Sequence, residues 1–204
     1  MQALDFGDPQ YVEAVEQRFE EVVSSDAMGD AYALTENLTD YYRTHPDFER
    51  SSTALLGRCE RLRLRAAWVA LPMLSEKEVL NLFKNSMSTM FALPEYNFTL
   101  KLRGFIMAII GLEERDRIKQ LFRQAMMENE EPFPTVATGE PSSLPQTMGL
   151  WLKHYNTYVN AKIGTSLQRV QYLTQVTGES LSVEQKEQLK QLIQAFDYLK
   201  LSSA

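Results

Sequence analysis

The chain has 204 residues, of which 44% are hydrophobic and 24% are charged, with nine glycines and eight prolines. These proportions are ordinary for a globular protein and leave little room for long disordered segments. The charge is uneven, because residues 1–144 hold 15 Lys and Arg against 23 Asp and Glu, whereas residues 145–204 hold six against four. A protein with a net charge of −6 is repelled by a phosphate backbone, so we expect no nucleic-acid partner.

The cysteine content and the apolar runs exclude further classes of protein. The single cysteine, Cys59, cannot form an intramolecular disulfide, and no pair of cysteines has the spacing of a zinc site. The N-terminal residues lack the basic start and apolar core of a signal peptide. The most apolar run, residues 105–112, is far shorter than the roughly 20 residues that cross a bilayer. We therefore expect a cytoplasmic protein with no membrane insertion.

Apolar residues recur at helical spacing in segment after segment, and helix-capping residues bracket these segments. Asp8 and Pro9 predict the N-cap and first residue of a helix. Ser75 and Glu78 predict a capping box that starts another helix at residue 76. After the helix that begins at Pro9, the expected helices of the N-terminal part cover residues 26–44, 46–72, 76–93, 97–111 and 113–127.

The helix expected over residues 97–111 differs from the others because apolar side chains cover most of its circumference. Such a pattern is typical of a helix that other helices enclose on several sides. We therefore expect this helix to be the central element of the bundle, with Ile109 among its enclosed residues.

Residues 130–145 hold four of the eight prolines and show no helical period, which predicts a linker or a long surface loop. Phe133 and Val136 are the side chains able to hold that loop against the bundle. Ser182 and Gln185 predict a second capping box in the part that follows. The expected C-terminal helices cover residues 146–162, 166–177 and 183–200.

The fold class expected from these elements is all-α, an irregular multi-helix bundle of about nine helices, six before and three after the proline-rich segment. No fixed repeat period is present, which disfavours a solenoid. The change of charge at the proline-rich segment favours two domains. Their expected limits are residues 1–130 for an N-terminal bundle, 131–145 for a linker or surface loop, and 146–204 for a C-terminal three-helix unit.

The three C-terminal helices carry a sequence pattern that extends over about a quarter of the chain. It consists of Trp151-Leu152-Lys153-His154-Tyr155, Arg169, Tyr172-Leu173, Leu181-Ser182 and Phe196-Asp197-Tyr198-Leu199. This pattern resembles a helical segment found in uncharacterised proteins of small-genome candidate-phyla bacteria. The resemblance implies an all-helical unit and brings no known activity with it.

Catalytic chemistry has few candidate residues in this sequence, so we nominate no catalytic residue, no metal ligand and no cofactor. Neither histidine, His45 or His154, has a glutamate three positions before it, as carboxylate-bridged metal sites in helical bundles require. His154 is next to Tyr155, which leaves open a proton-transfer pair, although a half-buried polar helix face is the favoured interpretation. Cys59 lies on an apolar stripe, which favours a small core side chain over a reactive thiol activated by the neighbouring arginines.

Four arginines form a basic stripe along the helix expected over residues 46–72, within an arc of roughly 80°. They are Arg50, Arg58, Arg61 and Arg65. The stripe offers a surface to an anionic partner. Alternatively it pairs with an acidic stripe on the first helix, formed by Glu13, Glu16 and Glu20, and we favour this second interpretation.

Aromatic residues with polar tips cluster directly after the proline-rich segment, at Trp151, Tyr155 and Tyr158. Such residues are enriched at protein interfaces, so they are candidate partner-binding residues together with Arg58, Arg61 and Arg65. A core position for Trp151 is the competing interpretation.

The leading functional hypothesis is a non-enzymatic helical module for protein–protein interaction, an adaptor or a subunit of a larger assembly, with a protein partner or self-association. The alternative is a regulatory domain that holds a small apolar or anionic ligand between the helices expected over 46–72, 76–93 and 97–111. An enzyme of an unrecognised helical class is the third hypothesis.

Overall fold

A computed structural model shows that the chain is all-α, as the sequence predicts. The structure describes residues 5–48, 53–133, 145–177 and 181–202. Within these ranges every regular element is a helix, and a single isolated β-bridge joins Pro132 to Thr147. In the same ranges no helix is both long enough and apolar enough to span a membrane.

The chain divides into two compact units, and the chain passes between them more than once. The first unit contains Met1–Ser75 and Thr89–Tyr96, and the second contains Glu76–Ser88 and Asn97–Ala204. This division differs from the expected one at residues 131–145, because the helices after that segment pack on helices that precede it.

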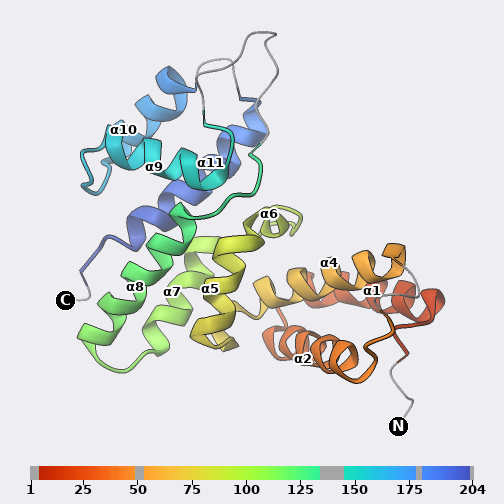
Figure 1. Ribbon diagram of the computed structural model, residues 1–204. Helices are drawn as coiled ribbons and strands as arrows, with labels where there is room; N and C mark the ends of the chain where they lie inside the picture. The colour runs from red at the N-terminus through yellow and green to blue at the C-terminus, as the bar shows by residue number, and fades with distance from the viewer. Residues whose placement is uncertain (1–4, 49–52, 134–144, 178–180, 203–204) are drawn as a thin grey trace. The chain divides into compact units, whose positions relative to one another are not determined.

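The first unit is built on one helix that packs against two others. Its helices are α1 (Pro9–Ser24), α2 (Met28–Thr44) and α4 (Thr53–Val69), followed by the short 3-10 helix η1 (Leu71–Met73). In Figure 1, α1 and α2 both lie beside α4, which buries Leu62 and Trp68 among other apolar side chains. As predicted, Asp8 caps α1, since its Oδ1 accepts a hydrogen bond of 2.9 Å from the backbone N–H of Gln10.

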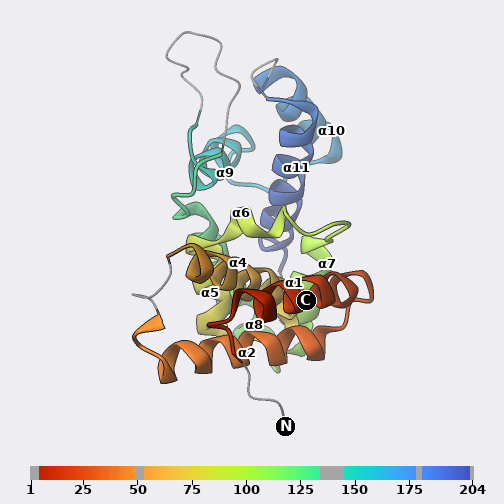
Figure 2. The same ribbon diagram turned by 90° about the vertical axis from the view of Figure 1, so that its right-hand side faces the viewer.

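Two layers of helices form the second unit. The helices are α5 (Glu76–Asn85), α7 (Phe98–Ala108), α8 (Leu112–Met127), α9 (Met148–Tyr158), α10 (Ser166–Gln171), the π-helical turn η2 (Tyr172–Val176) and α11 (Val183–Tyr198). The residues of the short helix α6 (Met87–Met90) are divided between the two units. In the first layer, α5, α7 and α8 surround an aromatic cluster in which the ring of Phe122 lies 5.0 Å from that of Phe83 and 5.3 Å from that of Phe105. The second layer contains α9 and α11, which lie side by side in Figure 2.

The prediction of a central, enclosed helix over residues 97–111 is wrong. Helix α7 buries one face, which includes Leu102, Phe105 and Ile106, and it ends at Ala108. Ile109 is half-buried in extended backbone, and 93% of Ile110 is exposed. The neighbouring helices α8 and α11 cover only the buried face, so the apolar side chains elsewhere on α7 remain at the surface.

The two ends of the expected linker are tied together. The backbone N–H of Phe133 donates to the carbonyl of Gln146 at 2.9 Å, and that of Met148 donates to the carbonyl of Glu131 at 3.1 Å. Phe133 is buried, with its ring 6.3 Å from that of Trp151. Phe133 therefore holds this end of the segment against the second unit, whereas residues 134–144, including Val136, lie outside the described residues.

Candidate functional site

The aromatic residues nominated for partner binding are mostly in the core. Trp151 and Tyr155 are completely buried, while 37% of Tyr158 is exposed. Helix α9 packs against both α8 and α11, and the ring of Tyr172 lies 5.1 Å from that of Tyr155 and 5.2 Å from that of Tyr158. The prediction of a partner-binding surface is therefore wrong for Tyr155, and the competing interpretation of a core position is confirmed for Trp151, because two neighbouring helices cover both side chains.

Tyr155 belongs to a buried polar cluster around Asp197 of α11, of which 3% is exposed. The Tyr155 hydroxyl donates to Asp197 Oδ2 at 2.6 Å, and Arg169 Nη1 donates to the same oxygen at 3.1 Å. The backbone N–H of Gly164 donates to Oδ1 at 3.3 Å, and Lys200 Nζ lies 3.5 Å from that oxygen. One carboxylate thus connects α9, α10, α11 and the turn before α10.

The electrostatics of this Asp197 cluster favour a structural role. Burial, and secondarily the hydrogen bond to Asp197, raises the pKa of Tyr155 far above its ordinary value, so the phenol remains protonated. Burial lowers the pKa of Lys200, whose Nζ donates to the carbonyl of Lys162 at 2.8 Å. A Cβ at Gly164 would overlap the Tyr155 hydroxyl. These groups satisfy one another inside a packed core, which is how buried charges are tolerated.

His154 pairs with Tyr172, which lies 18 positions further along the chain. His154 Nδ1 lies 2.9 Å from the hydroxyl oxygen of Tyr172, and that hydroxyl donates to the carbonyl of Trp151 at 3.3 Å. Burial raises the pKa of Tyr172, which keeps its proton. His154 therefore lies on a polar helix face, as the sequence favoured, but it is exposed where a half-buried position was expected.

Two arginines of the stripe form ion pairs with glutamates of α1. Arg58 forms an ion pair of 2.6 Å with Glu16, and Arg65 forms one of 2.9 Å with Glu20, so α4 and α1 pair their charges as favoured from the sequence. Arg61 is exposed. These contacts make Arg58 and Arg65 part of the packing between two helices of the first unit.

Cys59 is a core side chain, the interpretation that its apolar stripe favoured. It is fully buried, and its Sγ donates a weak hydrogen bond to the carbonyl of Phe6 at 3.9 Å. Burial raises the pKa of the thiol to about 11, against the opposing effect of Arg58. The thiol is therefore protonated at neutral pH. Arg50, the remaining arginine of the stripe, lies outside the described residues.

An apolar groove lies between α1 and α2 on the first unit and has a volume of about 440 Å³. Both helices pack on α4 and contact each other less, which leaves the groove open to solvent. Its apolar side chains are Tyr11, Ala14, Val15, Val22, Ala33 and Leu34, with Phe6 and Phe19 at its base. The polar residues of its lining are Arg18, Asp30 and Asn37.

The sequence contained a signal for this groove, because helix α1 carries more apolar positions than its buried face needs. Val12 and Phe19 are buried, whereas Tyr11, Val15 and Val22 are half-buried along an adjacent stripe. The second stripe follows positions i, i+4 and i+11, which share a face at 100° per residue. Periodicity alone does not tell which of the two stripes a neighbouring helix covers.

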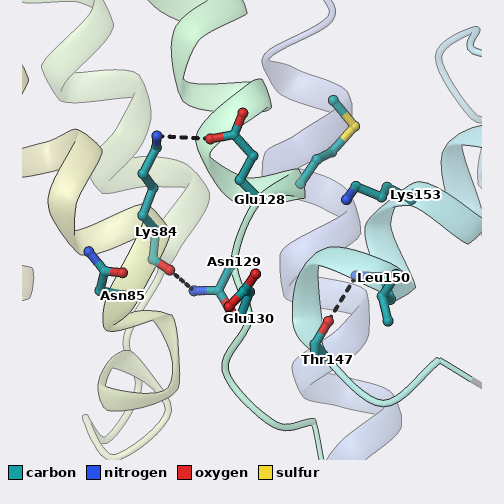
Figure 3. Close-up of a pocket in the computed structure, with 9 residues that line it drawn as sticks. Lys84, Asn85, Glu128, Asn129, Glu130, Thr147, Leu150 and Lys153 are labelled. Carbon is teal, nitrogen blue, oxygen red and sulfur yellow. Dashed lines mark hydrogen bonds and ion pairs between the residues drawn. The ribbon is translucent and has the colours of Figure 1, made fainter.

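The second unit has a polar cavity of about 750 Å³ between the ends of α5 and α8 and the start of α9. Figure 3 shows Lys84 Nζ in an ion pair of 2.8 Å with Glu128, with Lys153 on the wall formed by α9. The hydrogen bond from Lys84 lowers the pKa of Glu128. Glu130 completes a lining of two lysines and two glutamates, so the cavity carries no net charge.

The start of α9 forms the floor of this cavity and has little capacity left for an anion. The backbone N–H of Gly149 donates to the carbonyl of Asn129 at 3.1 Å, and that of Leu150 donates to Thr147 Oγ1 at 3.3 Å. A Cβ at Gly149 would lie 2.5 Å from the carbonyl oxygens of Asn129 and Met127, so only glycine allows this approach of α9 to the end of α8.

Among the described residues, no three His, Cys, Asp or Glu side chains gather closely enough to hold a metal ion. On α7, the turn after it and the first residue of α8, four apolar side chains leave most of their surface exposed, namely Leu100, Met107, Ile110 and Leu112.

Comparison of the chain with protein-family models, curated proteins and solved structures finds no match. The resemblance of the C-terminal segment to proteins of candidate-phyla bacteria therefore stays a prediction. The structure does bring together five residues of the pattern that carries it, because Trp151, Tyr155, Arg169, Tyr172 and Asp197 surround or belong to the Asp197 cluster.

Proposed function

We propose that this chain is a non-enzymatic helical interaction module that binds a helix of a protein partner in the groove between α1 and α2. The observation that carries the proposal is the groove itself, where apolar side chains of two helices line one solvent-open channel. Apolar surface in a concave channel is better covered by a partner than left in water, and such channels are recurrent sites of protein recognition.

The dimensions of the groove fit a helix of about three turns. Along α1, the lining extends from Tyr11 to Val22, which is about 16 Å at the rise of an α-helix. Ala14 and Ala33 are small, exposed residues on the two walls, which allows the backbone of a third helix to approach closely. An amphipathic helix placed there buries side chains at positions i, i+4 and i+7.

The polar side chains outside the groove also support a non-enzymatic function. The Asp197 cluster and Cys59 lie in the core, and the exposed His154 contacts the hydroxyl of Tyr172, which supports a structural role for them. We also propose a cytoplasmic location, which the single protonated thiol suits.

Site-specific photo-cross-linking in cells that express the full chain tests this function. A photoreactive amino acid at Ala33, on the groove wall, is compared with one at Leu167, which is 66% exposed on α10. We expect Ala33 to cross-link to one helical segment of one protein, and Leu34→Glu to abolish that product. Cross-links that are alike at Ala33 and Leu167, or none at Ala33, would contradict the proposal.

The second candidate function is binding of a small polar ligand in the polar cavity of the second unit. Its specific support is the cavity volume of about 750 Å³ and the placement of Lys84 and Lys153 on its walls. Native mass spectrometry of the purified chain tests it. A retained small molecule that Lys153→Ala releases supports this function, and a chain that carries only protein partners counts against it.

A further inference from the structure

We propose that the partner helix is basic: an amphipathic helix of about three turns whose Lys or Arg side chains flank the apolar face that fills the groove. This inference rests on the proposed function and names the chemistry of the partner. The first unit is strongly acidic, because it holds seven Lys and Arg against fourteen Asp and Glu, a net charge of −7. The second unit, with fourteen against thirteen, is nearly neutral.

The negative charge is concentrated on the two helices that form the groove. Together α1 and α2 contain seven acidic residues and two basic residues, Arg18 and Arg43. Two of the acids, Glu16 and Glu20, pair with arginines of α4. The acids of α1 and α2 that remain are exposed, namely Glu13, Glu21, Asp30, Glu36 and Asp40.

Helical spacing places a carboxylate near each end of the groove, outside its lining. Glu21 follows Ala14 by seven positions on α1, and Asp40 follows Ala33 by seven positions on α2, so each lies on the outer edge that its alanine lines. Because α1 and α2 are joined by a short turn and run antiparallel, these two carboxylates lie toward opposite ends of the groove. Asp30, in the lining, adds a negative charge at the end near Glu21.

Two arginines, Arg43 and Arg18, lie on the same two helices as these carboxylates. Arg18 adds a further requirement on the charges of the partner helix. Arg43 contacts Asp40 at 3.2 Å, but both side chains are more than two-thirds exposed, and such pairs contribute little. Arg18 is the one cation in the described lining, near the middle of α1. A partner helix that carries an acid at its centre and bases toward its ends therefore matches Arg18, Asp30, Glu21 and Asp40 together.

The test uses the full-length chain and three synthetic peptides of about four helical turns, labelled for fluorescence anisotropy. The first has an apolar face, one central Glu and flanking Lys and Arg. The second has the same apolar face with every charge reversed. The third keeps the charges of the first and replaces the apolar face with Ser and Asn. We expect the first to bind at least about tenfold more tightly than the second at low salt, with a difference that shrinks as salt is added, and the third not to bind.

Variants of the protein locate the binding. Ala33→Lys adds a positive charge at an exposed helical position of the groove wall and should weaken binding of the basic peptide at least about tenfold. Glu21→Gln should weaken it less, because the charge lies at the edge. Ile110→Glu, at a side chain 93% exposed in the second unit, is the matched control and should leave the affinity unchanged. Circular dichroism verifies that each variant is folded.

The outcomes separate this inference from the proposed function. If the charge-reversed peptide binds as tightly as the basic one and Ala33→Lys prevents both, the groove binds helices and the inference of a basic partner is overturned. If neither amphipathic peptide binds, or Ala33→Lys changes nothing while Ile110→Glu does, the groove is not the binding site and the proposed function fails with it.

Discussion

Replacing Asp197 with asparagine should destabilise the second unit more than any substitution of similar size at its surface. The change preserves the shape of the side chain and the acceptor for Gly164, but it removes the negative charge that faces two cations. The side chain of Lys200 is 4% exposed and that of Arg169 is 25% exposed. Lys200 is therefore left as a buried cation without its counter-charge, and the Tyr155 hydroxyl loses its charged acceptor.

The expected loss in the free energy of unfolding depends on which hydrogen bonds of the two cations remain in the Asp197→Asn variant. Breaking a buried ion pair by removing one partner costs about 3 to 5 kcal/mol. Two contacts lower this figure, because Lys200 still donates to the carbonyl of Lys162 and Arg169 still donates to that of Gly164. We therefore expect Asp197→Asn to lower the free energy of unfolding by about 3 kcal/mol, a large part of the roughly 5 to 15 kcal/mol that stabilises a domain.

Urea denaturation at neutral pH measures this effect, with fluorescence of Trp151 as the reporter of the second unit in a Trp68→Phe background. In the double variant with Lys200→Met the orphaned cation is absent, so the two losses should fall short of additivity by about 1 to 3 kcal/mol. Glu187→Gln, at an exposed ion pair of the same helix, is the control and should change stability by less than about 0.5 kcal/mol. An Asp197→Asn loss below about 1 kcal/mol, or additive losses in the double variant, would refute the argument.

Three further predictions concern stability. Gly149→Ala should cost about 1 to 3 kcal/mol or more in urea denaturation, because the new methyl group meets two backbone carbonyls that cannot rotate away; an unchanged midpoint would show that α9 can shift. Ser182→Ala should cost about 1 kcal/mol by removing the capping box of α11, and equal midpoints would mean that water replaces the cap. Burial raises the pKa of Tyr155 and Tyr172, so their stabilising contribution is complete below about pH 10, the unfolded pKa, and is lost as pH rises through their folded pKa. Tyrosinate absorbance should therefore show a delayed titration that coincides with loss of helical circular dichroism, and all nine tyrosines titrating near their ordinary pKa in folded protein would contradict it.

Where several helices begin was determined by the sequence alone. The start of α1 at Pro9, of α5 at Glu76 and of α11 at Val183 agree with the predicted caps, and Ser182 and Gln185 form the expected capping box. A cap needs only hydrogen bonds between residues two to four positions apart, so the information lies within one short stretch of chain. The all-α class follows for the same reason, because apolar spacing of three and four residues repeats locally.

Only the tertiary structure decided which apolar stripe is covered. Ile110 of the α7–α8 turn is exposed, although the helical pattern over residues 97–111 predicted a central helix, and Trp151 is buried, where the sequence left both a surface and a core position open. The contact of Tyr155 with Asp197, 42 positions away, has no local signal, and the second apolar stripe of α1 does not show that no helix covers it. Burial depends on which helices become neighbours and at what distance, and a periodic pattern shows that a face is apolar without showing what covers it.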